Sequence, residues 1–281
     1  MKHGNKPVKY SGLLQFEGQS IPYHYWAVAG RSPDTLLLLG AAQTGRIAKW
    51  VAATAGPGVV VAEGVPHWHI GTDPDQLLRL VDTYAQAVLQ AAIETFEVRS
   101  LNLMAESQVT PGAVRLAYAS PEQIRNIALI LPMGLTVEQL GDTKEARLRE
   151  FKRRMLQTMR QKYNSPLRRP RYAYLWLTAV WLGVRYHKTT NQQFATGVSF
   201  DITQALQQVA CGQAARGASL HILLGKYDIL FPAHEIQTAL KKAHLHTVPV
   251  TVVDTGHTSL ATRAGKRTLD IALRLVRTSL H

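Results

Sequence analysis

"LNLMAESQVTPGAVRLAYASP", residues Leu101 to Pro121, changes its pattern at a single serine. An apolar run leads up to Ser107, and from Pro111 onward apolar and small residues recur at helical spacing. A short apolar run bounded by a turn predicts a buried strand, whereas the later spacing predicts an amphipathic helix. Ser107 is therefore predicted to lie in a tight turn between a strand and the helix that follows it.

The same two patterns alternate along most of the chain. Two strand-like runs at 11–18 and 21–30 are joined by a short turn containing glycine, which predicts a β-hairpin. Further buried strands are predicted within residues 34–45, 58–64, 98–107, 124–134, 219–232 and 247–259. Helices are predicted within 47–56 and 75–96, after 111, within 233–244, and from about 263. Strands that alternate with helices predict an α/β fold, with a mostly parallel sheet covered by helices on both faces.

One long segment interrupts this alternation. Residues 135–215 contain no clear buried strand, but they include a basic helix, a turn with prolines and a run rich in aromatic residues. We expect them to form a helical cap inserted into a core made of residues 1–134 and 216–281.

Charge is concentrated in the same segment. The chain of 281 residues carries a formal net charge of +13, and residues 144–171 hold eleven Lys or Arg against two Glu, a net of +9. Such a segment attracts anionic substrates or an anionic membrane surface, and the alternative is a solvated basic helix face. Nucleic-acid binding is disfavoured, because the aromatic residues are grouped apart from these charges.

Other features limit the class of protein. The single cysteine, Cys211, excludes an internal disulfide, and the two histidines of "PHWH" (66–69) have no third ligand nearby, so no metal site is predicted. The N-terminus lacks the apolar stretch of a secretory signal, and the longest apolar run, 172–184, is shorter than the roughly 20 residues that span a bilayer. We expect a soluble, cytoplasmic protein.

Three residue types with complementary chemistry follow three predicted strands. Ser107 follows "LNLMAE", Asp228 lies in "GKYDILFP", and His257 lies in "DTGHT". Open α/β sheets place their sites at the carboxyl ends of the strands, so these side chains are expected at one edge. Taken singly, each residue has an ordinary alternative: a turn serine, an Asx-turn or helix-capping aspartate, and a loop histidine.

In this order and after these strands, the three stretches resemble the α/β-hydrolase family, and the resemblance covers nearly the whole chain. "LMAESQVTPGAVRLAYASPEQI" is similar to the family's nucleophile elbow and the helix after it, "GKYDILFP" to its acid loop, and "DTGHT" to its histidine loop. The resemblance implies that Ser107 is the nucleophile, that His257 is its general base and that Asp228 orients the imidazole. It also implies an oxyanion hole made by the backbone N–H groups of Ala42 and Gln108, with no metal or organic cofactor.

The implied activity is that of a serine hydrolase that cleaves a carboxylic ester or thioester through an acyl-enzyme. An apolar or anionic substrate is expected from the aromatic run and from the basic segment. Residues expected to line the substrate pocket are Ala41, Trp68, Val109, Trp176 and Trp181.

The chain also departs from the family pattern G-x-S-x-G. Ala105 and Val109 stand where the elbow has glycines, and Gly40-Ala41 stands where the family usually has His-Gly. The bulk of Val109 predicts crowding at the turn, because the elbow glycines permit a close approach of neighbouring chains. Two alternatives therefore stay open: a catalytically silent fold that binds a ligand or partner, and an acyltransferase with the same three residues.

Overall fold

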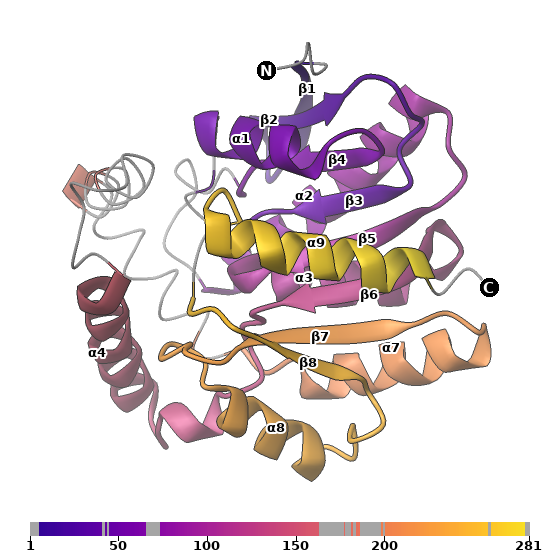
Figure 1. The fold of residues 1–281 in the computed structure, drawn as a ribbon. Helices are drawn as coiled ribbons and strands as arrows, with labels where there is room; N and C mark the ends of the chain where they lie inside the picture. The colour runs from indigo at the N-terminus through magenta and orange to yellow at the C-terminus, as the bar shows by residue number, and fades with distance from the viewer. Residues whose placement is uncertain are drawn as a thin grey trace.

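An eight-stranded sheet runs through the described part of the protein (Figure 1). The computed structural model describes residues 6–40, 43, 45–65, 74–162, 177, 181, 184–185, 198, 200–257 and 260–278. The strands are β1 (Pro7–Phe16), β2 (Gln19–Val28), β3 (Thr35–Leu38), β4 (Val59–Ala62), β5 (Leu101–Glu106), β6 (Ile124–Ile130), β7 (Leu220–Gly225) and β8 (Val250–Val253). Their order in the sheet is β1-β2-β4-β3-β5-β6-β7-β8, and the six strands from β3 to β8 are parallel to one another.

The predicted hairpin at the N-terminus is confirmed. β1 and β2 are antiparallel over their whole length, and Glu17 and Gly18 connect them. Both connecting residues have positive φ, 47° and 78°, as a two-residue hairpin turn of the type I′ class requires. β2 then pairs with β4 in the antiparallel sense, which attaches the hairpin to the parallel part of the sheet.

Helices cover both faces of the sheet, so the predicted fold class is confirmed. One face carries α1 (Arg46–Ala55) and α9 (Arg263–Thr278), which lie together in front of the sheet in Figure 1. The other face carries α2 (Pro74–Phe96), α3 (Thr110–Ala119), α7 (Thr203–Ala215) and α8 (Ala233–Lys242). The central strands β3, β4 and β5 are buried at every position, as continuous apolar runs in parallel sheets predict.

The predicted basic helix is present as α4 (Lys144–Lys162), which follows β6 and lies beyond the edge of the sheet in Figure 1. The later helix α7 falls within the proposed cap range 135–215, but its Leu206 and Val209 are buried in the cluster that α3 and the sheet share. The division into core and cap stays a prediction. Within the described ranges, every helix is too short or too polar to cross a bilayer.

Candidate active site

Ser107 sits at a sharp turn between β5 and α3. Glu106 before it is extended, with φ −111° and ψ 126°, whereas Ser107 itself has a φ of 57°. A left-handed conformation is uncommon for a residue other than glycine, and such strained residues concentrate at functional sites. The turn is closed by Thr110, whose hydroxyl donates a hydrogen bond of 2.6 Å to the carbonyl of Ser107. The local backbone therefore raises Ser107 beyond the carboxyl end of the strand.

The three residues that follow the strands β5, β7 and β8 are brought together in space. Ser107 Oγ lies 3.2 Å from Nε2 of His257, and Nδ1 of His257 lies 2.9 Å from Oδ2 of Asp228. An ionised carboxylate only accepts hydrogen bonds, so Nδ1 carries the proton in the neutral imidazole. Nε2 is then free to accept the proton of the serine hydroxyl, which is the arrangement that a general base needs.

Asp228 is fixed by its other carboxylate oxygen. Oδ1 accepts the backbone N–H groups of Leu230 at 2.8 Å and Phe231 at 3.0 Å, and the side chain has no exposed surface. Asp228 thus makes the Asx-type turn that its sequence context alone would suggest, and it contacts the histidine as well. The two functions use different oxygens of one carboxylate.

The loops that carry Asp228 and His257 are joined through their backbones. The N–H of Tyr227 donates to the carbonyl of Thr255 at 2.9 Å. A Cβ on Gly225 would lie 2.8 Å from the same carbonyl oxygen, so only glycine permits this approach at the end of β7. Close contact between the loops keeps the carboxylate within reach of the imidazole.

An aromatic side chain packs against the imidazole. The ring of Phe231 meets that of His257 edge to face, with centroids 5.4 Å apart, and Phe151 of α4 lies 6.1 Å from Phe231. Because Phe231 follows Asp228 by three residues, one loop both orients the histidine and supports its ring. α4 reaches the site through this pair of phenylalanines.

α4 is held beside the site by partly buried ionic contacts. Arg154 donates to both carboxylate oxygens of Glu235 in α8, at 2.8 and 2.9 Å, and also contacts Glu150. A hydrogen bond from Arg153, aided by Arg154 and opposed by partial burial, lowers the pKa of Glu150 to about 2. Part of the predicted basic segment is therefore neutralised within the protein, whereas Lys144 and Arg149 are exposed.

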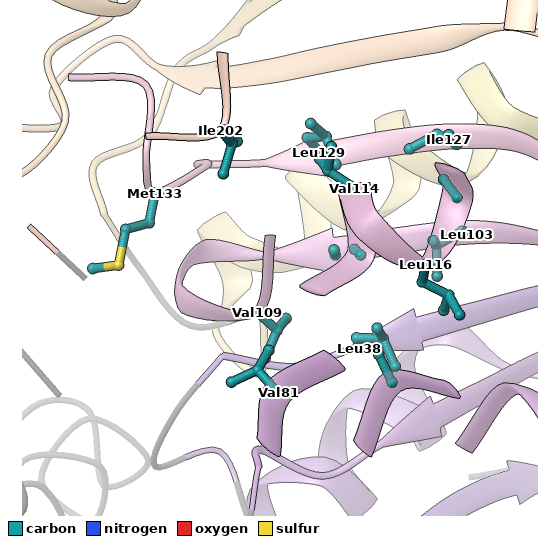
Figure 2. Close-up of a cluster of buried hydrophobic side chains, with 14 of the residues drawn as sticks. Leu38, Val81, Leu103, Val109, Val114, Leu116, Ile127, Leu129, Met133 and Ile202 are labelled. Carbon is teal, nitrogen blue, oxygen red and sulfur yellow. The ribbon is translucent and has the colours of Figure 1, made fainter. Parts of the chain in front are cut away.

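Ser107 Oγ lies within 3.2 Å of Nε2 of His257 although Ala105 and Val109 stand where the G-x-S-x-G pattern has glycines. Val109 is buried in the hydrophobic cluster under α3, where its side chain points toward Val81 of α2 (Figure 2). Close approach is permitted by other glycines: a Cβ on Gly112 would lie 2.5 Å from Cγ1 of Val81, and a Cβ on Gly40 would lie 3.1 Å from the carbonyl oxygen of Glu106. The crowding expected from Val109 is absent because its side chain packs into the core.

Among the remaining predicted site residues, the structure describes Gln108 and Trp181. Gln108 is half-buried in the first turn after Ser107, where N–H groups at a helix start have no partner within the helix. Trp181 is 52% exposed, and the guanidinium of Arg185 lies 5.1 Å from the centre of its ring. Four of the predicted residues lie outside the described residues: Ala41, Ala42, Trp68 and Trp176. Across the described ranges, no group of three or more His, Cys, Asp or Glu is arranged to hold a metal ion.

Sequence reasoning missed two residues beside the serine. Glu106 and Gln43 are both buried, and Nε2 of Gln43 donates a hydrogen bond to the carboxylate of Glu106. One signal was available, because Glu106 is a charged residue at the end of a strand that is otherwise apolar apart from Asn102. Nothing local, however, indicated that Gln43 would meet it.

Several solved structures share this architecture. A candidate lipase from Acinetobacter baumannii is similar with a TM-score of 0.63 at 14% identity, covering 96% of this chain and 92% of that one. An α/β-hydrolase enzyme from a Medee basin deep-sea metagenome library has a TM-score of 0.58 at 12% identity, with 93% and 96% covered. An esterase from Pyrococcus furiosus has a TM-score of 0.57 at 12% identity, with 96% and 91% covered.

Comparison of the sequence with protein-family models and with curated proteins gives no match. The structural likeness, at these identities, concerns the fold. The chain therefore has the α/β-hydrolase fold, as its three loop motifs indicated.

Proposed function

We propose that this protein is a serine hydrolase that cleaves a carboxylic ester or thioester through an acyl-enzyme on Ser107. The observation that carries the proposal is the hydrogen-bonded chain from Ser107 through His257 to Asp228. A hydroxyl is a weak nucleophile until a positioned base can take its proton, and this chain supplies both the base and the group that orients it. The strained turn at Ser107 adds support, since such backbone strain concentrates at functional sites.

In the first half of the reaction, Ser107 Oγ attacks the carbonyl carbon while its proton passes to Nε2 of His257. The tetrahedral intermediate carries a negative oxygen, for which the backbone N–H groups of Gln108 and Ala42 are the proposed donors. Such donors are each worth about 3–4 kcal/mol of transition-state stabilisation. As the intermediate collapses, the bond to the leaving group breaks and the imidazolium returns the proton to the departing alcohol or thiol.

In the second half, a water molecule gives a proton to Nε2 of His257 and attacks the acyl carbon. The ester bond to Ser107 Oγ then breaks, and the serine recovers its proton from the imidazolium as the carboxylic acid leaves. Asp228 stabilises the imidazolium in both halves without taking up its proton. The residues thus regenerate after each turnover.

The substrate class is proposed from the charges on α4, the helix that reaches the site through Phe151, and from the neighbours of the same fold. Those neighbours include an esterase and a candidate lipase. The exposed cations Lys144 and Arg149 on α4 favour acyl compounds with an anionic group, or an anionic lipid surface that presents the ester. A substrate panel should therefore pair neutral and anionic leaving groups on the same acyl chain.

Labelling with a fluorophosphonate probe, followed by assays on p-nitrophenyl esters and acyl thioesters, tests the proposal. The wild type is compared with Ser107→Ala and His257→Ala. Ser11→Ala is a matched control, since Ser11 Oγ also lies 3.0 Å from a histidine nitrogen, Nδ1 of His24, on the exposed hairpin. We expect labelling and turnover in the wild type and in Ser11→Ala, and loss of both in the other two variants. A folded wild type that neither labels nor turns over any substrate would instead favour a silent fold that binds a ligand.

A further inference from the structure

The carbonyl of Ser107 is held by three hydrogen-bond donors. The backbone N–H of Thr110 donates to it in the first turn after β5, and the hydroxyl of the same residue donates at 2.6 Å. The N–H of Met133, in the segment that follows β6, donates at 3.4 Å. The start of α3 and the segment beyond the neighbouring strand therefore fix the direction of one carbonyl.

Thr110 is suited to this contact by its burial. The residue has no exposed surface, so water cannot replace the carbonyl as the partner of its hydroxyl. A buried hydroxyl without a partner is costly, and the bond of 2.6 Å thus links the conformation of Thr110 to that of Ser107. Ser107 has a φ of 57°, a left-handed conformation that is strained in a residue other than glycine. The hydroxyl therefore helps to hold a strained residue in place.

The peptide group that joins Ser107 to Gln108 transmits this constraint. Its atoms lie close to one plane, and in a trans peptide the C=O and the N–H point in opposite directions. The carbonyl of Ser107 points along the first turn toward Thr110, so the N–H of Gln108 points back out of the start of the turn. Any rotation of the carbonyl about the chain rotates this N–H with it.

We propose that Thr110 is a positioning residue whose hydroxyl fixes the plane of this peptide group and so aims the N–H of Gln108 at the oxyanion. The inference rests on the proposed function, in which this N–H is one of the oxyanion donors. A hydrogen bond weakens steeply when its donor is misaligned, and a donor that is already aimed needs no rearrangement during the reaction. Thr110 acts through the backbone and need not touch the substrate.

The test removes the hydroxyl of Thr110 from the full chain without changing the shape of the side chain. Thr110→Val replaces the hydroxyl by a methyl group, and Thr110→Ser keeps it. Thr268→Val in α9 is the matched control, because Thr268 is 1% exposed and its hydroxyl donates to the carbonyl of Ala264 at 3.3 Å, outside the turn at Ser107. For each variant we would measure Tm, and kcat and KM on a p-nitrophenyl ester and on the matching thiono ester, which has C=S in place of C=O.

Misalignment of one oxyanion donor should appear mainly in kcat, because the donor acts on charge that develops in the transition state. Removing such a donor lowers kcat by about 10²–10³ in known enzymes. The N–H of Gln108 would be misaligned rather than removed, so we expect Thr110→Val to lose about 10- to 100-fold in kcat, with KM changed less than about threefold. Thr110→Ser should retain most of the wild-type kcat. Thr268→Val should retain all of it, with a lowered Tm.

The thiono ester separates an effect on the donor from an effect on the nucleophile. Sulfur accepts hydrogen bonds more weakly than oxygen, so a well-aimed N–H favours the oxygen ester over its thiono analogue. In Thr110→Val the ratio of kcat/KM for the oxygen ester to kcat/KM for the thiono ester should therefore fall, whereas Thr110→Ser should keep the wild-type ratio. A displaced Ser107 Oγ would slow both substrates alike and leave the ratio unchanged.

If Thr110→Val does not fold, Thr110→Ala and Thr110→Ser give the same comparison, because these two variants differ only in the hydroxyl. Thr110→Ala should then show the lower kcat and the lower ratio. A folded variant without the hydroxyl that keeps the wild-type kcat, or that is slowed with an unchanged ratio, would overturn this inference and leave the proposed function standing. A wild type that neither reacts with the fluorophosphonate nor turns over either ester would instead overturn the proposed function itself.

Discussion

Under the proposed function, replacing Asp228 by Asn should abolish nearly all hydrolysis while leaving the fold intact, and the hydrogen bonds of Asp228 give the reason. Oδ1 of Asp228 accepts two backbone N–H groups, so an Asn side chain must keep its carbonyl oxygen at that position. The NH2 group is then forced into the place of Oδ2, 2.9 Å from Nδ1 of His257. Because NH2 only donates, Nδ1 must become the acceptor and the proton moves to Nε2.

The resulting tautomer cannot accept a proton from Ser107. In serine proteases the same change lowers kcat by about 10⁴, which corresponds to about 5.5 kcal/mol in the activation free energy. We expect a loss of this order in the present protein. Both backbone hydrogen bonds to the side chain persist, so the variant should unfold within a few degrees of the wild type.

The assay is kcat on a p-nitrophenyl ester at constant pH, together with Tm for each protein. Asp270→Asn is the control, since Asp270 forms an exposed pair with Lys266 on α9 and the chemical change is identical. The control should keep the wild-type kcat. If folded Asp228→Asn kept more than about a tenth of the activity, the argument that Asp228 sets the tautomer would be refuted.

Three further predictions concern stability. Gly112→Ala should destabilise the fold by about 1–3 kcal/mol in urea unfolding, because its Cβ would lie 2.5 Å from Cγ1 of Val81, and adding Val81→Ala should recover part of that loss. Burial lowers the pKa of His221 from its ordinary value of 6.5, so the unfolded chain binds a proton at this residue more readily than the folded protein does. The free energy of unfolding should therefore be highest above pH 6.5 and should decrease as the pH falls below 6.5. Tm should therefore drop less between pH 7.5 and pH 5.5 in His221→Val than in the wild type. Arg154→Met should lower the free energy of unfolding in urea by about 3 kcal/mol, because it leaves the largely buried carboxylate of Glu235 without the guanidinium of Arg154. An unchanged unfolding midpoint would show that the pair does not stabilise the fold.

Local pattern was sufficient to predict the elements and to locate the serine, aspartate and histidine, because Ser107 directly follows β5, and Asp228 and His257 lie in the loops just after β7 and β8. Local pattern was insufficient to predict side-chain contacts that depend on which strands become neighbours in the sheet. The contact between Gln43 and Glu106 requires β3 to lie beside β5 with Leu38 opposite Ala105, a register that no short stretch encodes. The same holds for α7, whose apolar residues pack on α3 only after the intervening segment has returned the chain to the sheet.

The turn at Ser107 shows how a tight strand-to-helix geometry can form without the glycines of the G-x-S-x-G pattern. A tight strand-to-helix turn needs a small residue wherever another segment of the same chain approaches it closely. That small residue can lie in the turn itself or in the segment that approaches it. At the turn, Gly40 of the neighbouring strand end provides the space beside Glu106 and Ser107, with its Cβ position 3.4 Å from Cβ of the serine. One turn into the helix, Gly112 provides the space against α2, and Val109 is left free to fill the core. A pattern restricted to the residues that flank the serine therefore misses Gly40 and Gly112, the glycines that permit the close approaches in this structure.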